Sequence, residues 1–394
     1  LEITAAPGGS PVIEQTVTDR VFHALNGFGD LTIRGPMTIT GGNAGSSSGG
    51  LIYAIRNGSL ILEDVSLTDG QTSNLGGCVS FAAPTVPGSL SLTNVIISGC
   101  RTEHYGGGLS AEVGDSSATF DRVVIEDNIA GARGGGVHIS SSSTTVLFID
   151  STIQNNVSED PVDGYGYGGG INFGSAKARF ERSTVARNRA GVATGDGGWG
   201  GGINFSNSNV TLRNSTVSGN VVKGSACRGS AIRLGTGSTL LLEQSTIVGD
   251  PASSLVWSAV GVIADGAVTF EGSIVEGGCS IGSGTSTSNG YNVERPIDGS
   301  VTTQCGLTNP SDVLTSSPFL KPLAGYGGPT ATHALLPGAP AIFLVASTYC
   351  QDTDQRLAPR EYLFCDAGSF ESSGQPPGIW IFNDGFESGD TAAW

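Results

Sequence analysis

The sequence has few charged side chains and almost no lysine or methionine. Only 14% of the 394 residues are Asp, Glu, Lys or Arg, and Lys occurs three times and Met once. No long window is rich in Ala, Glu, Lys and Leu, the residues that favour a helix. The chain contains 62 Gly together with abundant Val, Ile, Leu, Thr and Ser. We therefore predict an all-β chain with many turns.

Signals of several other protein classes are also absent. The formal charge of -16 argues against nucleic acid as a partner, because a phosphate backbone requires a basic surface. No apolar run reaches about 18 residues, so we expect no transmembrane segment. Gly-x-Ser-x-Gly, Walker and His-Glu-x-x-His motifs are missing, so the sequence gives no support to these enzyme classes.

The seven cysteines form three pairs of sequence neighbours and leave one residue over. The predicted disulfides are Cys78–Cys100, Cys279–Cys305 and Cys350–Cys365, with Cys227 unpaired. No Cys-x-x-Cys pair indicates a metal site. Disulfides form in oxidising compartments, so we expect a secreted, extracellular or cell-surface protein.

A repeat organises most of the chain. It is clearest as Gly-Gly-Gly-Ile-Asn-Phe, which occurs at 168–173 and again at 200–205. Each repeat carries an apolar anchor, with a small or apolar residue two positions before it and another apolar residue five positions after it. The anchors are Leu62, Leu92, Phe120, Phe148, Phe180, Leu212, Leu242 and Phe270. Alternation within such short runs indicates strands, and a unit this small buries its apolar face only by stacking on the next unit.

The repeat predicts a parallel β-helix, a three-sided solenoid of nine or more coils with three short strands in each coil. We predict a right-handed helix, because crossovers between parallel strands are overwhelmingly right-handed. Both ends should be capped, since a bare edge invites further strand addition. The predicted divisions are the start of the solenoid with an N-terminal cap at 1–30, coils at 31–278, irregular C-terminal coils and a cap at 279–370, and a linker with a C-terminal tail at 371–394.

Polar residues recur at fixed positions after the anchors. Asn128, Asn156, Asn188 and Asn220 follow their anchors by the same interval. Asn tolerates the left-handed conformation and can hydrogen-bond to its counterpart in the next coil, so we interpret these residues as a structural ladder. A second predicted ladder consists of Ser151, Ser183, Ser215, Ser245 and Ser273.

Three motifs lie near the C-terminus. They are Gly-Gly-Pro-Thr-Ala-Thr-His-Ala-Leu-Leu-Pro-Gly-Ala-Pro-Ala-Ile at 327–342, Asp-Gln-Arg at 354–356 and Cys-Asp-Ala-Gly-Ser-Phe-Glu at 365–371. With them, the segment 316–371 resembles the C-terminal part of the bacterial choice-of-anchor Q domain of secreted right-handed β-helix proteins. Phe343 departs from that pattern, which commonly has Asp there. The resemblance implies an exported or surface-associated bacterial protein but no particular reaction, because the fold family includes adhesins, surface proteins and carbohydrate-active enzymes.

The outward position of the Gly-led strand is the place to look for a functional site. We predict that this position is occupied, coil by coil, by Ile52, Val79, Ser110, His138, Asn172, Asn204 and Arg233. His138 and Arg233 are the catalytic candidates, although a solvated strand face with an Asn pair explains the same pattern. The candidate ligand-binding residues are Asn172, Asn204, Tyr165, Tyr167 and Trp199, because aromatic rings beside a polar strip suit glycan stacking. Asp160, Asp163 and Asp196 are candidate Ca²⁺ ligands, and no other metal or cofactor is expected.

Three functions remain open. The first is a secreted or cell-surface structural or adhesive protein without catalytic activity, self-associating in an extracellular matrix or contacting other surface proteins. The second is a polysaccharide lyase or glycosidase with a groove along the Gly-led strands. The absence of an Asp/Glu pair repeated at one outward position argues against it. The third is a glycan-binding protein without turnover.

Overall fold

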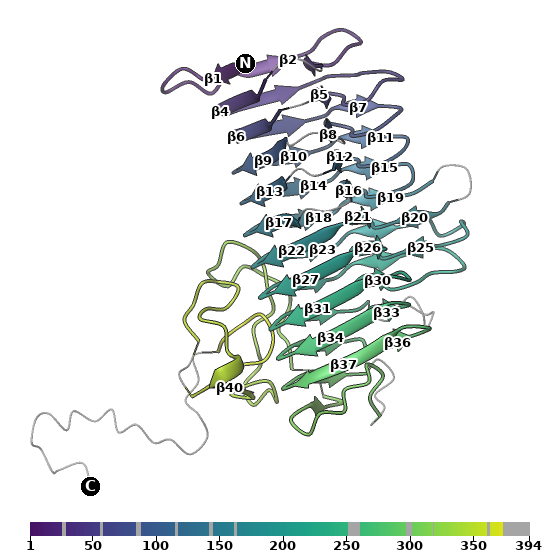
Figure 1. Ribbon diagram of the computed structural model, residues 1–394, viewed down its shortest axis with the longest axis vertical. Helices are drawn as coiled ribbons and strands as arrows, with labels where there is room; N and C mark the ends of the chain where they lie inside the picture. The colour runs from purple at the N-terminus through teal and green to yellow at the C-terminus, as the bar shows by residue number, and fades with distance from the viewer. Residues whose placement is uncertain are drawn as a thin grey trace, which may run out of the picture.

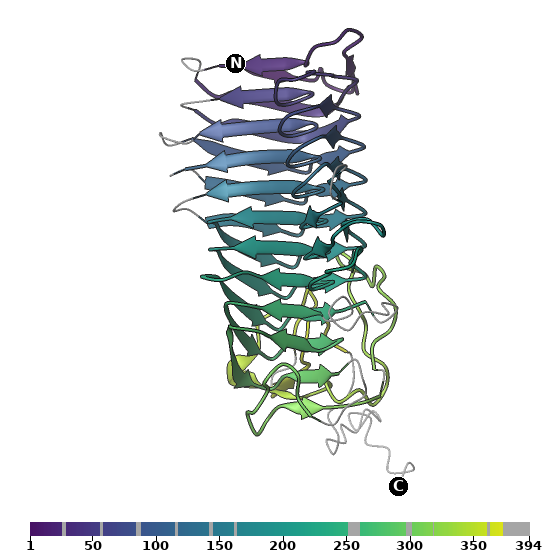
Figure 2. The same cartoon turned by 90° about the vertical axis from the view of Figure 1, so that its right-hand side faces the viewer.

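The computed structural model is a solenoid of about nine coils, in which the strands stack parallel to one another along one axis (Figures 1 and 2). It describes residues 1–25, 29–55, 58–83, 88–114, 117–141, 145–160, 164–250, 261–296, 302–317, 319–360 and 363–372. Across these residues no helix is long and apolar enough to span a membrane. The predicted parallel β-helix is confirmed.

One coil shows the plan of the whole solenoid. It consists of β12 (Leu109–Val113), β13 (Ser117–Asp121), β14 (Val124–Glu126) and the short β15 (Ile129–Ala130). Strands β12, β13 and β14 match the three predicted strands. The sequence did not predict β15, because a two-residue strand shows no alternation.

The strands of successive coils form three parallel sheets. The Gly-led sheet contains β3 (Phe22–Ala24), β5 (Ile52–Ile55), β8 (Val79–Ala83), β12, β16 (Val137–Ser141), β21 (Ile171–Gly174), β26 (Ile203–Ser206), β30 (Ile232–Leu234), β33 (Val262–Ala264) and β36 (Cys279–Ile281). The short sheet contains β7 (Gln71–Thr72), β11 (Arg101–Thr102), β15, β19 (Val157–Ser158), β24 (Arg189–Ala190) and β29 (Val221–Val222).

The third sheet, here called the lateral sheet, carries the anchor residues. It contains β1 (Glu2–Thr4), β2 (Val12–Glu14), β4 (Leu31–Thr40), β6 (Leu60–Thr68), β9 (Ser89–Thr93), β10 (Ile96–Ser98), β13, β14, β17 (Thr145–Ile149), β18 (Thr152–Gln154), β22 (Lys177–Glu181), β23 (Thr184–Ala186), β27 (Asn209–Arg213), β28 (Thr216–Ser218), β31 (Thr239–Glu243), β32 (Thr246–Val248), β34 (Ala267–Glu271), β35 (Ile274–Glu276), β37 (Thr285–Gly290), β38 (Val293–Arg295) and β39 (Val313–Leu314). Outside the three sheets lie the parallel pair β20 (Gly166–Tyr167) and β25 (Gly198–Trp199), the antiparallel pair β40 (Val345–Ala346) and β41 (Phe364–Cys365), and the 3-10 turn η1 (Ser347–Tyr349).

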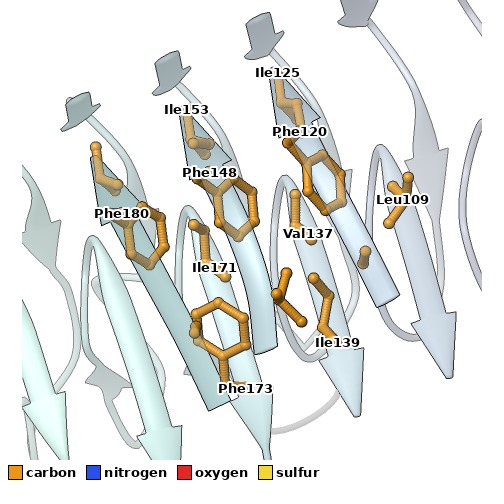
Figure 3. Packing of buried hydrophobic residues seen from close by; sticks show 14 of the residues in the cluster. Leu109, Phe120, Ile125, Val137, Ile139, Phe148, Ile153, Ile171, Phe173 and Phe180 are labelled. Carbon is orange, nitrogen blue, oxygen red and sulfur yellow. The ribbon is translucent and has the colours of Figure 1, made fainter. Parts of the chain in front are cut away.

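The anchor residues form a continuous column inside the solenoid. All eight predicted anchors are at most 1% exposed. The rings of Phe120, Phe148 and Phe180 stack with centroid separations of 4.4 and 4.6 Å, and Phe173 from the Gly-led sheet meets two of them edge to face (Figure 3). Fully burying a side chain of this size contributes about 1.5–3 kcal/mol, so the column is a main source of stability.

In the coil that opens with Gly168, Gly169 and Gly170, glycine is required at each of the three positions. Gly168 has a φ of +65°, in the left-handed region that favours glycine. A Cβ on Gly169 would lie 2.4 Å from the Gly201 carbonyl oxygen in the next coil. A Cβ on Gly170 would lie 2.8 Å from Nδ2 of Asn188. The third glycine therefore leaves the space that the Asn ladder occupies.

The Asn ladder is confirmed. Nδ2 of Asn128, Asn156 and Asn188 donates to Oδ1 of the next Asn at 2.9, 3.0 and 2.9 Å, and each backbone N–H donates to the same oxygen. All four residues are fully buried. The Ser ladder is confirmed as well, with the backbone N–H of each Ser donating to Oγ of the next.

The two ends of the solenoid differ from each other. Residues 1–24 build a coil of their own rather than a separate cap, because β1 and β2 pair with β4 and β3 pairs with β5. At the other end coils continue beyond residue 278 through β36, β37 and β38. Cys305 and Leu307 then pack into the core at this end. All three predicted disulfides form, and Cys227 is free.

The segment after the last coil folds back along the side of the solenoid. We expected 318–370 to form further coils or a cap over the end, but residues 319–360 and 363–372, here called the clasp, lie against the lateral sheet of the lower coils (Figure 1). Part of the clasp encloses a second apolar core, in which Phe319, Leu335 and Val345 pack with Ile274 of β35. The irregular, Pro-rich sequence of this segment did not indicate which surface it would cover.

Candidate functional site

The outward position of the Gly-led sheet carries a line of polar side chains, here called the polar row. Strand pairing places Tyr53, Ser80, Ser110, His138, Asn172, Asn204 and Arg233 in this row. The prediction of Ile52 and Val79 was wrong by one residue, since both are fully buried in the core. Leu51 and Cys78 replace the third glycine of the triplet in these coils, so counting from the last glycine shifted the alignment.

Directed hydrogen bonds join the middle of the polar row. Nη1 of Arg233 donates to Oδ1 of Asn204 at 3.4 Å, Nδ2 of Asn204 donates to Oδ1 of Asn172 at 2.7 Å, and Nδ2 of Asn172 donates to Nδ1 of His138 at 3.0 Å. Asn172 and Asn204 are only 3% and 4% exposed. The predicted ligand-binding amides therefore lie together, but they bond to each other beneath the surface.

The His138 imidazole is held in its neutral form. Burial, together with the smaller effect of the Arg133 charge, lowers its pKa to about 4. The bond from Asn172 acts in the same direction, because it needs a free lone pair on Nδ1. At the other end of the row, Arg233 lies 3.7 Å from the Asp265 carboxylate and under the Trp199 ring at 4.6 Å. His138 and Arg233, the two catalytic candidates, are separated by three coil steps. They are therefore too far apart to act together on one bond of a substrate.

A second line of residues runs beside the polar row, and we call it the aromatic–arginine column. It consists of Tyr105, Arg133, Tyr167, Trp199 and Arg228, which pair in parallel from coil to coil. The Arg133 guanidinium lies 5.4 Å from the Tyr105 ring centroid and 5.2 Å from that of Tyr167. Tyr167 meets Trp199 edge to face at 5.3 Å, and Arg228 lies 5.5 Å from Trp199.

The sequence prediction found Tyr167 and Trp199 but missed the arginines of this column. Each column member stands immediately before a Gly that opens its strand, as in Tyr105-Gly106, Arg133-Gly134 and Arg228-Gly229. Extending the repeat alignment by one residue would have revealed the whole column. The predicted Tyr165 lies beside it, with its ring centroid 6.2 Å from that of Tyr167.

The predicted acidic sites are more dispersed. Asp163 lies outside the described residues, and Asp196 is exposed. Asp160 lines a cavity of about 260 Å³ together with Glu103 and Glu159, and Glu159 is paired with Arg189 at 2.5 Å. Throughout the described part of the chain, no three His, Cys, Asp or Glu side chains are grouped so that they could hold a metal ion. Calcium therefore stays a prediction without a described ligand set.

The free Cys227 lies at the lower end of the column. It lines a cavity of about 370 Å³ together with Arg228, Ile263 and Asp265. Burial raises the pKa of its thiol, and Sγ donates to the Gly224 carbonyl at 3.1 Å. A raised pKa keeps the thiol protonated, which is unfavourable for a nucleophile.

Comparison with known families agrees with this architecture. Residues 87–295 match the family described as the right handed beta helix region. The match covers 209 of the 394 residues, so the chain belongs to this family, and the predicted handedness is confirmed. No curated protein and no solved structure matches the chain.

Proposed function

We propose that this protein is a secreted or cell-surface bacterial β-helix of the choice-of-anchor Q type. It acts as a structural or adhesive component that self-associates in an extracellular matrix, and it has no catalytic activity. The observation that carries this proposal is that the side chains of the polar row from His138 to Arg233 are bound to one another or to neighbouring residues. His138 is neutral and already accepts a bond from Asn172, and Arg233 is engaged by Asp265 and Trp199. General acid–base catalysis requires a group that is free to exchange a proton with the substrate.

The C-terminal motifs support the same proposal. Gln355 of the Asp-Gln-Arg motif contacts Thr216 and Thr184 of the lateral sheet, and Ser369 of the last motif contacts Thr216 and Thr246. The residues that carry the resemblance thus attach the clasp to the solenoid. Three disulfides add an argument for an oxidising, extracellular location.

An activity screen tests the absence of catalysis. The purified protein is incubated with acidic and neutral polysaccharides, and unsaturated uronate absorbance and new reducing ends are followed. We expect no product above a heat-treated control. Product that disappears in a His138→Ala/Arg233→Ala variant would instead establish the lyase or glycosidase alternative at the polar row. Surface protease treatment of intact producing cells tests the location, and a chain protected until lysis would contradict it.

The aromatic–arginine column favours a second candidate function, glycan binding without turnover. Tyr105, Tyr167 and Trp199 present partly exposed rings in one line, the geometry that stacks against sugar rings. Replacing Tyr167 and Trp199 with Ala is expected to abolish retention on a glycan array. Unchanged retention would show that any binding lies elsewhere.

A further inference from the structure

Two arginines of the aromatic–arginine column lack an acidic partner. Most arginines in the described residues form an ion pair, including Arg34, Arg182 and Arg360. Arg133 and Arg228 form none with any described residue, and both are exposed. Their planar groups instead lie against the rings of Tyr105, Tyr167 and Trp199. Each guanidinium therefore keeps N–H donors available to a ligand.

Two aromatic members of the column, Tyr105 and Trp199, pack against the polar row. The ring of Tyr105 packs against His138 with centroids 5.0 Å apart, and Trp199 covers Arg233. The backbones of the column residues pair from coil to coil, and Nε1 of Trp199 donates to the Ala226 carbonyl at 3.3 Å. These two aromatic side chains therefore lose little freedom when a ligand binds, which favours affinity.

We propose that the aromatic–arginine column binds an acidic polysaccharide whose strand runs along the solenoid axis. This inference rests on the glycan-binding candidate and specifies its ligand class. Sugar rings stack on the three aromatic side chains, and carboxylate or sulfate groups pair with Arg133 and Arg228, whose fork of donors matches such anions. Coils stack at about 4.8 Å, so the two arginines lie roughly 14 Å apart along the axis and select widely spaced charges on an extended polymer.

The net charge of -16 does not oppose this ligand class at short range. Charges farther away than a Debye length of about 8 Å are largely screened at physiological ionic strength. Exposed Glu103 and Asp196 precede Tyr105 and Trp199 in the chain and make the surroundings of the column acidic. Closely spaced phosphates would meet these carboxylates as well as the two arginines, so the column favours an acidic glycan over single-stranded nucleic acid.

The test measures binding to matched polymers by calorimetry. Polygalacturonate is compared with its methyl-esterified form, which keeps the backbone and removes the charge, and dextran sulfate is compared with dextran. We expect binding to one or both charged polymers, at least tenfold weaker binding to the neutral partner, and weakening by added salt. The two charged polymers distinguish a carboxylate ligand from a sulfate ligand. Equal binding of charged and neutral forms overturns the inference, and so does equal binding of oligo-dT.

Variants locate the binding face. Arg133→Gln/Arg228→Gln should weaken binding to the charged polymer at least tenfold and remove the preference over its neutral partner. Arg122→Gln is the matched control, because Arg122 belongs to the same coil as Arg133 but pairs with Asp121 on the lateral sheet. Trp199→Ala should also lose binding, whereas Tyr167→Phe should retain it. Unchanged melting temperatures show that each variant is folded, and a double variant that binds normally overturns the inference.

Failure of the inference and failure of the proposed function give different results. A protein that binds none of the polymers and degrades none refutes the ligand assignment and leaves the structural role standing. A protein that cleaves polygalacturonate refutes the non-catalytic proposal, whether or not the column variants change its affinity.

Discussion

The lateral sheet has two regions with the same backbone register and different surfaces. One outward column runs through both regions, from Ile96 and Val124 in the upper coils to Thr184, Thr216 and Thr246 in the lower coils. Ile96 is 42% exposed, whereas the three threonines are at most 1% exposed under the clasp. At these coils the exposed position carries an apolar side chain and the three positions under the clasp carry hydroxyl groups, whereas the next covered position, Ile274, packs into the apolar core of the clasp.

The threonine hydroxyl groups show how the clasp is attached. Oγ1 of Thr216 donates to Oε1 of Gln355 at 2.6 Å and lies within hydrogen-bonding distance of the Thr332 and Ser369 hydroxyls. Below it, Thr246 accepts bonds from the backbone N–H and the hydroxyl of Ser369. The lower coils therefore hold the clasp through a buried polar network, and such a network confers specificity only when all its members are satisfied.

The largest expected effect comes from breaking the most buried ion pair of the clasp. Arg360 donates to Glu371 at 3.0 Å and to Oδ1 of Asn214 at 2.9 Å, with 1% of its side chain exposed. Arg360→Ala leaves Glu371 as a buried charge without this partner, which costs about 3–5 kcal/mol. We expect clasp amides to lose hydrogen-exchange protection while the upper coils keep theirs.

The matched control for this change is Arg34→Ala in the upper coils. Arg34 forms an exposed pair with Glu63 at 2.7 Å that water screens, so its loss should change the stability far less than the loss of Arg360. Equal losses of protection in the two variants would show that the clasp does not depend on its buried pair.

The sequence predicted the solenoid but not the clasp, and the reason is physical. Contacts inside the solenoid repeat at one interval, so a residue such as Phe148 reveals its neighbours Phe120 and Phe180 by spacing alone. Thr216 and Gln355 are 139 residues apart and belong to no period, so no local pattern connects them. The polar row was only partly predictable from the sequence. Its residues follow the repeat, so their positions could be predicted, but their burial depends on the aromatic–arginine column beside them, whose arginines the sequence prediction did not include.

A pair of Thr→Val variants measures what one hydroxyl group contributes under the clasp and above it. Thr216→Val keeps the shape of the side chain but leaves Oε1 of Gln355 without its hydroxyl donor, an effect of about 1–3 kcal/mol. Thr152→Val changes the equivalent position one coil above the clasp contacts and should stay within about 0.5 kcal/mol. Chemical denaturation and hydrogen exchange of both variants measure the difference. Similar values would mean that the hydroxyl column is not what attaches the clasp.

The clasp should also loosen in acid. Nε2 of His333 lies 2.7 Å from Oγ of Ser218, Nδ1 lies 2.6 Å from the Lys321 carbonyl, and burial lowers the pKa of the ring. A detached His333 titrates near its usual pKa of about 6.5, so the detached form binds the proton more readily. The clasp contact is therefore at full strength above that pH and weakens as the pH falls below it, by at most about 1.4 kcal/mol per pH unit.

Hydrogen exchange of the clasp amides between pH 7.5 and 5, corrected for intrinsic rates, measures this dependence. His333→Gln should flatten the profile, because the titrating group is removed. His104→Gln, at an exposed position in the upper coils, should leave it unchanged. A wild-type clasp with the same opening free energy at both ends of the range would contradict the assignment.

The smallest expected effect lies on the uncovered part of the same column. Ile96 is held in β10 by pairing with Ser66 and Val124, and its side chain is partly open to solvent. Ile96→Thr places the residue of the covered coils at an uncovered position, where water satisfies the new hydroxyl. We expect a change within about 0.5 kcal/mol in the midpoint of chemical denaturation and no change in clasp exchange. A loss as large as that of Thr216→Val would show that Ile96 is buried in solution by a partner, which would extend the covered region of the lateral sheet to the upper coils.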